Sequence, residues 1–221
     1  MTTRPVPHGL RSLATAGALA AVFVATAAAQ DHPQDPRLGR LDAGARSLVA
    51  VVIDSARAAG LHTEPLVQRA LEGATKGAPG SLIVSAVQRL AADLGRARAA
   101  LGAGATPPEL EAGAAALRAG AGTPVLAQLR RSRRQTITVP LAVLTDLVAS
   151  GVPVDSAAAA VLALAAGTRD ADLIDFRRAV ERDIALGAAP TAATAAAAAG
   201  LQSTDATHVN AGARDARPGR P

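Results

Sequence analysis

Apolar residues recur along most of the chain at the spacing of an amphipathic α-helix. Between residues 82 and 101, aliphatic side chains return every three, four or seven positions, and polar residues occupy the opposite side. A second stripe of the same kind consists of Leu173, Phe176, Val180 and Ile184. A stripe with a period of 3.6 residues predicts a helix that buries one face. The pattern therefore predicts an all-α fold of eight or nine short helices.

Local signals indicate where these helices begin and end. Residues 106–109, Thr-Pro-Pro-Glu, have the form of a capping box, in which Thr106 and Glu109 each bind the backbone N–H of the other. Thr63 and Thr123 stand before similar proline-containing starts and are predicted N-caps. Five glycines stand where helices should end: Gly60, Gly102, Gly151, Gly167 and Gly187. Only residues 135–139 resemble a strand, and so short a stretch before a proline favours a linker.

Two stretches of the chain resemble each other. Residues 59–64, AGLHTE, align with residues 150–155, SGVPVD, and residues 86–89, AVQR, align with residues 179–182, AVER. This similarity predicts a three-helix unit at residues 43–101 that is repeated at residues 138–187, with two connector helices within residues 106–132. The alternative is that alanine-rich helices resemble one another through composition alone. Since two copies are few for a solenoid, we expect one compact bundle of paired helical layers.

The beginning of the sequence has the pattern of a secretory signal peptide. Arg4 and Arg11 precede an apolar run at residues 13–29, which ends in three alanines. This pattern predicts export to the periplasm or the medium, with cleavage after Ala29. The alternative is an uncleaved membrane anchor, because the run is at the lower edge of the length that spans a bilayer. We expect no transmembrane segment in the mature chain.

Polar segments flank the predicted helical domain. Residues 30–42 are rich in charged residues and proline, and residues 201–221 lack helical periodicity. Such compositions favour disorder, because they offer little apolar surface to bury. The folded domain is therefore expected to span residues 43–200, with an alanine-rich terminal helix at residues 190–200.

Composition excludes several kinds of chemistry. The chain has no cysteine, which rules out disulfides, thiol catalysis and cysteine metal sites. Phe176 is the only aromatic residue after the signal, so aliphatic residues must form the core and no aromatic platform can stack bases. All 18 acidic residues but only 21 of the 23 basic ones follow residue 29, which leaves a mature net charge of +3. This modest charge disfavours nucleic acid as a partner.

Four arginines gather in residues 129–140, LRRSRRQTITVP. Arg130, Arg131, Arg133 and Arg134 stand at the end of a predicted short helix. Basic side chains there interact favourably with the negative end of the helix dipole, by about 0.3–1 kcal/mol each. We interpret the cluster as a solvated helix end. The alternative is a patch for an anionic partner, such as lipid headgroups or a cell-wall polymer.

Cleavage after Ala29 would create one candidate metal site. Gln30, Asp31 and His32 would offer an amine, two amides and an imidazole in the square-planar arrangement that Cu(II) and Ni(II) accept. Cyclisation of Gln30 would remove the amine ligand, and an incidental polar leader is the alternative. We expect no cofactor, since no other motif suggests one.

The chain lacks the sequence motifs of familiar active sites with their residues in the required order. Residues 73–81, GATKGAPGS, contain the residue types of a phosphate loop in the wrong sequence. Acidic residues that are distant along the chain can still meet in space. A carboxylate-based hydrolase would therefore need a deep pocket lined by at least two of four acids: Asp54, Glu64, Asp146 and Asp155.

Together these patterns favour a binding function. We expect a non-catalytic exported module that binds another envelope protein or an extended peptide, through apolar helix grooves or its arginines. The first alternative is an envelope hydrolase that uses carboxylates. The second is a carrier of a small apolar ligand or lipid, which would need an enclosed apolar cavity. The arrangement of the side chains in space distinguishes the three.

Overall fold

The computed structural model describes residues 35–215, with side chains described through residue 203. In this part of the chain every regular element is a helix, which confirms the all-α prediction. The elements are η1 (Pro36–Arg40), α1 (Ala43–Ala58), α2 (Glu64–Thr75), α3 (Gly80–Leu101), α4 (Pro107–Arg118), α5 (Thr123–Ser132), α6 (Thr138–Ala149), α7 (Val154–Ala165), α8 (Asp170–Ala185) and α9 (Pro190–Asp215). Only η1 is a 3-10 helix among them.

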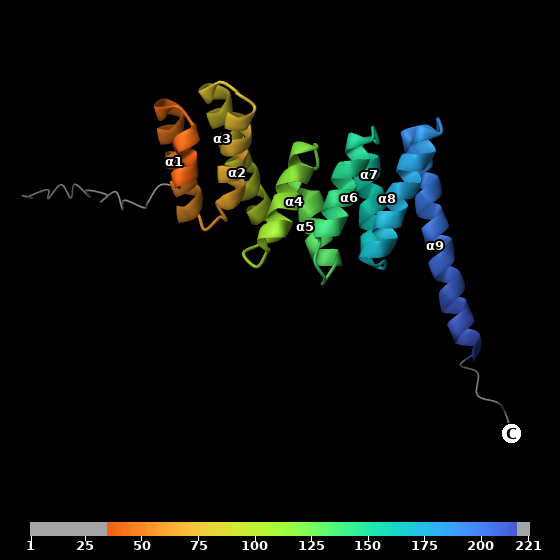
Figure 1. Ribbon diagram of the computed structural model, residues 1–221. Helices are drawn as coiled ribbons and strands as arrows, with labels where there is room; N and C mark the ends of the chain where they lie inside the picture. The colour runs from red at the N-terminus through yellow and green to blue at the C-terminus, as the bar shows by residue number, and fades with distance from the viewer. Residues whose placement is uncertain (1–34, 216–221) are drawn as a thin grey trace, which may run out of the picture. The chain divides into compact units, whose positions relative to one another are not determined.

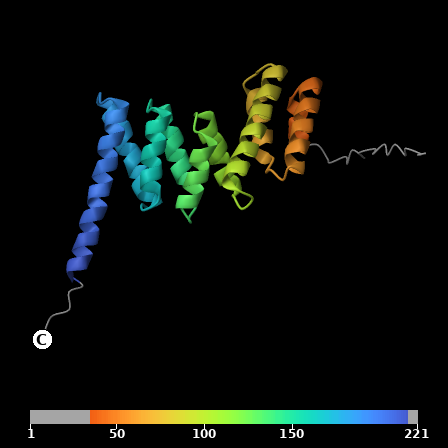
Figure 2. The same cartoon turned by 180° about the vertical axis from the view of Figure 1, so that it is seen from behind.

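The helices pack in two adjoining rows. In one row α6 packs between α4 and α8, and in the other α5 and α7 pack in order between α3 and α9. At the start of the rows, α1 and α2 both pack against α3, and η1 lies against α2. Figures 1 and 2 show this succession of helices from opposite sides. The described residues thus belong to one compact unit of paired helical layers, as expected.

The helix starts follow the local signals with one difference. The capping box of α4 is present: Glu109 Oε2 accepts the Thr106 N–H at 3.0 Å, and Thr106 Oγ1 accepts the Glu109 N–H at 3.4 Å. In α5, however, Gly122 is the N-cap and Thr123 is already helical. The proline after Thr123 has no backbone N–H, but the N–H groups of the first helical turn have no partner within the helix. Pro124 is therefore compatible with a helix that begins at Thr123 as well as with one that begins at Pro124.

Two glycine turns end α1 and α6 in the same manner. Gly60 and Gly151 have φ angles of 71° and 91°, in the left-handed region that glycine adopts without strain. The residue after each glycine donates its backbone N–H back to the helix, to the carbonyls of Ala56 and Leu147 at 2.9 and 3.0 Å. These turns occupy corresponding places in the two predicted units. The duplication itself stays a prediction.

The core consists of aliphatic side chains, as the composition predicts. Phe176 on α8, the one aromatic residue of the described part, is fully buried. The leucines that are fully buried are Leu38, Leu66, Leu126, Leu129, Leu141, Leu144, Leu147 and Leu173. Small residues allow close helix approach: a Cβ on Gly113 of α4 would lie 3.1 Å from the Cβ of Ala97 on α3. The rows are therefore joined by tight aliphatic packing rather than by aromatic contacts.

Part of the predicted leader belongs to the folded unit. Residues 35–42 were expected to be disordered, but η1 forms at Pro36–Arg40 and the side chains of Leu38 and Leu41 are buried. Two separated leucines do not form a periodic apolar stripe, so the sequence does not predict that they are buried. Their burial depends on the packing of η1 against α2. Residues 1–34, which include the predicted signal peptide, lie outside the described residues.

The last helix continues beyond its predicted end. α9 runs to Asp215, whereas the sequence places its end near Gly200, which does not adopt a positive φ angle. Disorder of residues 201–221 stays a prediction, since the side chains after residue 203 and all of residues 216–221 lie outside the description. Within residues 35–215, none of the helices combines the length and the apolar character that crossing a bilayer requires.

Candidate functional site

The arginines of residues 130–134 face in two directions. Arg131 and Arg134 are exposed and bind no other side chain in the described part of the chain. In contrast, the side chains of Arg130 and Arg133 are only 27% and 3% exposed. The interpretation as a solvated helix end therefore fits Arg131 and Arg134 but not Arg130 and Arg133. Of the predicted anionic-partner patch, only Arg131 and Arg134 remain accessible to a partner.

Arg133 is a buried cation that joins α5 to α7 and α8. Its Nη1 donates to the backbone carbonyls of Ala165 and Thr168 at 3.1 and 3.3 Å. Its Nη2 donates to the Asp170 carboxylate at 2.6 Å and to Gln135 Oε1 at 3.1 Å. The carbonyls lie at the C-terminal end of α7, where the helix dipole favours a cation. Arg133 thus stabilises the fold and is not available to a ligand.

Glu109 is a buried anion in the same region. Its Oε1 accepts hydrogen bonds from Arg130 at 3.0 Å and from the backbone N–H of Ile137 at 3.1 Å. Burial raises the pKa of Glu109, but the bonds from the N–H groups of Thr106 and Ile137, together with the charge of Arg130, lower it by more. The carboxylate therefore stays ionised and ties α4 to α5 and to the linker before α6.

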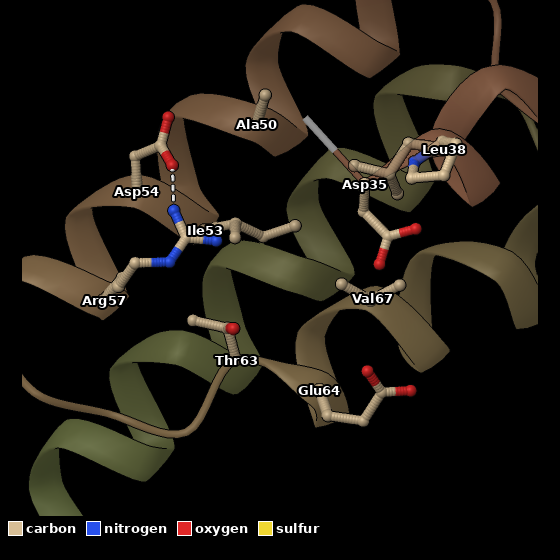
Figure 3. Close-up of a pocket in the computed structure, with 10 residues that line it drawn as sticks. Asp35, Leu38, Ala50, Ile53, Asp54, Arg57, Thr63, Glu64 and Val67 are labelled. Carbon is tan, nitrogen blue, oxygen red and sulfur yellow. Dashed lines mark hydrogen bonds and ion pairs between the residues drawn. The ribbon is translucent and has the colours of Figure 1, made fainter. Parts of the chain in front are cut away.

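Two of the four acids proposed for a hydrolase border one cavity. Asp54 on α1 and Glu64 on α2 line a cavity of about 330 Å³, shown in Figure 3. Asp146 instead pairs with Arg177 at 2.6 Å, and Asp155 is exposed in the first turn of α7. The fold therefore brings one pair of these acids to a common cavity and places the other two elsewhere.

This pair is not prepared for acid–base catalysis. Glu64 accepts hydrogen bonds from both terminal nitrogens of Arg37 and from Gln68, and these bonds lower the pKa of Glu64 to about 2. Asp54 is bound to the guanidinium of Arg57. A general acid needs a group that still carries its proton near neutral pH. Glu64, with its lowered pKa, therefore serves better as a fixed negative charge, and the Asp54 carboxylate is occupied by Arg57.

A different cluster of arginines surrounds a hollow on α2, α3 and α4. The cluster consists of Arg69 on α2, Arg89 and Arg96 on α3, and Arg118 on α4. The hollow has a volume of about 380 Å³, and Leu90 and Ala86 contribute apolar lining. Side chains from three helices thus converge on a concave surface that is both cationic and apolar.

Two of these four guanidinium groups are not neutralised by the described part of the chain. Arg69 and Arg96 each bind an acidic residue three positions away on their own helix, at 2.9 and 2.6 Å. Arg89 and Arg118 are exposed and make no hydrogen bond or ion pair with any described residue. The hollow therefore presents two uncompensated positive charges beside the apolar lining.

The hollow is the middle of a longer groove. A neighbouring hollow of about 410 Å³ shares Arg69, Leu90 and Arg118 with it and reaches His62 before α2. Another of about 280 Å³ shares Arg69, Ala86 and Arg89 and reaches Leu82, one of the few large apolar side chains that are mostly exposed. Since the lining is shared, we treat the three as one surface, the arginine groove. Acidic residues line its outer parts, so the cationic surface is the middle hollow; these acids are Glu64, Glu72 and Glu111.

The pattern of residues along the chain does not predict this groove. Arg89 and Arg96 stand seven residues apart and so share a helix face, which is a visible signal. They were assigned to the solvent side of an amphipathic helix, where charged residues are ordinary. Arg69 and Arg118 belong to other helices, and only the packing of α2 and α4 against α3 brings them beside this face.

Gln30, Asp31 and His32 lie outside the described residues, so the copper or nickel site stays a prediction. Among residues that the structure does describe, no cluster of three or more acidic or histidine side chains is arranged to hold a metal ion. The strongest candidate site is therefore the arginine groove.

Comparisons of the chain with protein-family models, with curated proteins and with solved structures find no match.

Proposed function

We propose that this protein is a non-catalytic, exported interaction module whose arginine groove binds an extended acidic segment of another envelope protein. The observation that supports the proposal is the convergence of four arginines from three helices on one groove. Arg89 and Arg118 in particular have no partner in the described part of the chain. Export is supported by the signal-peptide pattern of residues 1–29.

The chemistry of the groove suits a peptide with both acidic and apolar side chains. A guanidinium can bind a carboxylate through two parallel hydrogen bonds, which favours arginine over lysine for this purpose. Leu90, Ala86 and the exposed Leu82 offer apolar contacts along the same surface. Arg89 and Arg118 would attract the acidic side chains of the segment at the middle of the groove, since neither pairs with a described residue.

The two alternatives have less support from the described cavities. In the cavity of Figure 3, Arg37 and Gln68 lower the pKa of Glu64, and Asp54 is bound to Arg57, which weakens the hydrolase proposal. A carrier of an apolar ligand needs an enclosed apolar cavity. The hollows described above are instead bordered by charged residues such as Arg69 and Arg57.

A matched pair of double variants tests the groove. Arg89→Gln with Arg118→Gln removes two exposed and unpaired arginines from the groove, whereas Arg131→Gln with Arg134→Gln removes two of the same kind from outside it. Both variants change the net charge equally. A general electrostatic attraction would therefore weaken in both, and a specific groove only in the first.

The measurement is fluorescence anisotropy of a labelled peptide of glutamate and leucine, alongside capture of proteins from the cell envelope by the tagged chain. We expect the groove variant to bind the peptide about 10-fold more weakly or worse, since a hydrogen bond to a charged group contributes about 1.5 kcal/mol or more. The captured partner should be lost in parallel. Equal losses in both variants would reject the groove. A loss confined to the Arg131 and Arg134 variant, with weaker sedimentation on anionic vesicles, would favour the anionic-surface alternative.

A further inference from the structure

The cavity between η1, α1 and α2 has charged groups on two opposite sides and an apolar middle. It is the cavity of about 330 Å³ shown in Figure 3. The figure places Arg57 and its partner Asp54 on one side, Asp35 and Glu64 on the other, and the side chain of Ile53 between them. Buried residues from all three helices supply the apolar lining: Leu38, Ala50, Ile53 and Val67.

The negative side of the cavity is rigidly held. Arg37 bridges the two carboxylates, with Nη2 2.6 Å from Asp35 and 2.8 Å from Glu64. These bonds occupy only part of the acceptor capacity of each carboxylate, because an ionised carboxylate has about four lone-pair sites. Two carboxylates that share a single arginine keep a net negative charge on this side.

The opposite side carries donors that are not fully used. Arg57 is bound to Asp54 through Nη1, and no hydrogen bond from its other two guanidinium nitrogens is formed within the described residues. Thr63 is the N-cap of α2, but its side chain makes no cap hydrogen bond, although a threonine in this position usually does. A guanidinium and a hydroxyl are therefore available to an anionic group in the cavity.

We propose that this cavity binds a small aliphatic zwitterion, with the ammonium group at Asp35 and Glu64, the carboxylate at Arg57, and the alkyl body on Ile53 and Val67. Each part of such a ligand meets a matching part of the lining. The lining contains no aromatic residue, so recognition depends on N–H donors and not on cation–π contacts. An ammonium group with three N–H donors suits two carboxylates better than a quaternary amine does.

Isothermal titration of the intact chain with 6-aminohexanoate tests the proposal. This probe has an ammonium and a carboxylate at opposite ends of an aliphatic chain. Hexylammonium and hexanoate, which each lack one charged end, are the comparison ligands. We expect 6-aminohexanoate to bind at least about 10-fold more tightly than either, a difference of about 1.4 kcal/mol. No heat of binding, or equal binding of the three, would overturn the proposal.

Arg57→Gln and Arg178→Gln form a matched pair of variants. Both arginines are exposed, and each pairs with an aspartate three residues earlier on its own helix, Asp54 or Asp175. Loss of Arg57 should reduce 6-aminohexanoate binding to the level of hexylammonium, whereas loss of Arg178 should change nothing. If the two variants bind alike, Arg57 does not hold the ligand and the proposal is wrong.

The same titration separates this cavity from the arginine groove. The double variant Arg89→Gln, Arg118→Gln should bind 6-aminohexanoate as the unmodified chain does, because neither residue lines the cavity. Binding should also persist at pH 5. At that pH Glu64, with a pKa lowered to about 2 by its bonds to Arg37 and Gln68, is still ionised. Loss of binding at pH 5, or in the double variant, would contradict the assigned ligand position.

Discussion

The guanidinium of Arg130 lies 3.0 Å from the carboxylate of Glu109, 21 residues earlier in the chain. The same Glu109 oxygen accepts the N–H of Ile137 at 3.1 Å, so one buried charge connects the start of α4, the end of α5 and the linker before α6. A hydrogen bond to a charged group contributes about 1.5–3 kcal/mol to stability, and the Glu109 side chain that accepts these bonds is almost fully buried. This network therefore provides a sensitive test of the fold.

Glu109→Gln should lower the free energy of unfolding by about 2 kcal/mol, within the range for a hydrogen bond to a charged group. The amide keeps the shape of the side chain, but it loses the charge that faces Arg130. Urea denaturation followed by far-ultraviolet circular dichroism measures the effect. Glu111→Gln, on the exposed face of the same helix, should stay within about 0.5 kcal/mol of the unmodified chain. Coincident curves for the two variants would show that the network adds no stability.

Two neighbouring arginines should differ widely in their contribution to stability. Arg133→Ala leaves the carbonyls of Ala165 and Thr168 without their donor. A buried polar group that loses its partner costs about 1–3 kcal/mol, so we expect a loss of about 2 kcal/mol. Arg134→Ala removes an exposed side chain and should change stability by less than about 0.5 kcal/mol. Thermal and urea unfolding of both variants provide the comparison. Similar losses in both would contradict the inward position of Arg133.

Two glycines of α3 should respond oppositely to alanine. A Cβ on Gly80 would collide with the Asp42 carboxylate and lie 2.9 Å from the Cβ of Ala45. Asp42 caps α1 by accepting the Ala45 N–H at 2.8 Å, so Gly80→Ala should cost about 1 kcal/mol through loss of the cap. Gly95 has no atom within 4 Å of an added Cβ, and Gly95→Ala should stabilise the helix by about 1 kcal/mol. Urea midpoints that shift in the same direction would refute this prediction.

Stability should fall at acid pH in a window that Glu64 partly sets. Its bonds to Arg37 and Gln68 lower its folded-state pKa from 4.5 to about 2. A carboxylate with a depressed folded-state pKa contributes stability above its unfolded-state pKa and loses it as the pH falls through the folded-state value. Glu64→Gln should therefore be less stable than the unmodified chain at pH 7, and the difference should vanish as the pH falls from about 4.5 to about 2. Urea midpoints across this range check the convergence. A difference that is independent of pH would assign the effect to packing and not to charge.

Much of the helical architecture follows from interactions between near neighbours in the chain. The capping box of α4 needs only Thr106 and Glu109, and the turns after α1 and α6 need only Gly60 and Gly151 with the residues beside them. Helix hydrogen bonds connect residues four positions apart, so periodicity and caps are visible without a structure. The burial of Leu38 cannot be predicted in this way. It results from contacts of η1 with α2, and the residues next to Leu38 in the chain do not indicate these contacts.

The formation of amphipathic helices with an aliphatic core follows from the chain alone, because the apolar period and the residue types are written in its order of residues. Which charged residues can meet a partner depends instead on how the helices pack. Arg133 and Arg134 are adjacent, yet one is buried between helices and the other faces solvent. Arg89 and Arg118 belong to different helices, yet they line one groove. The surroundings of a side chain depend on which helices pack against its own, and those contacts join residues that are far apart along the chain.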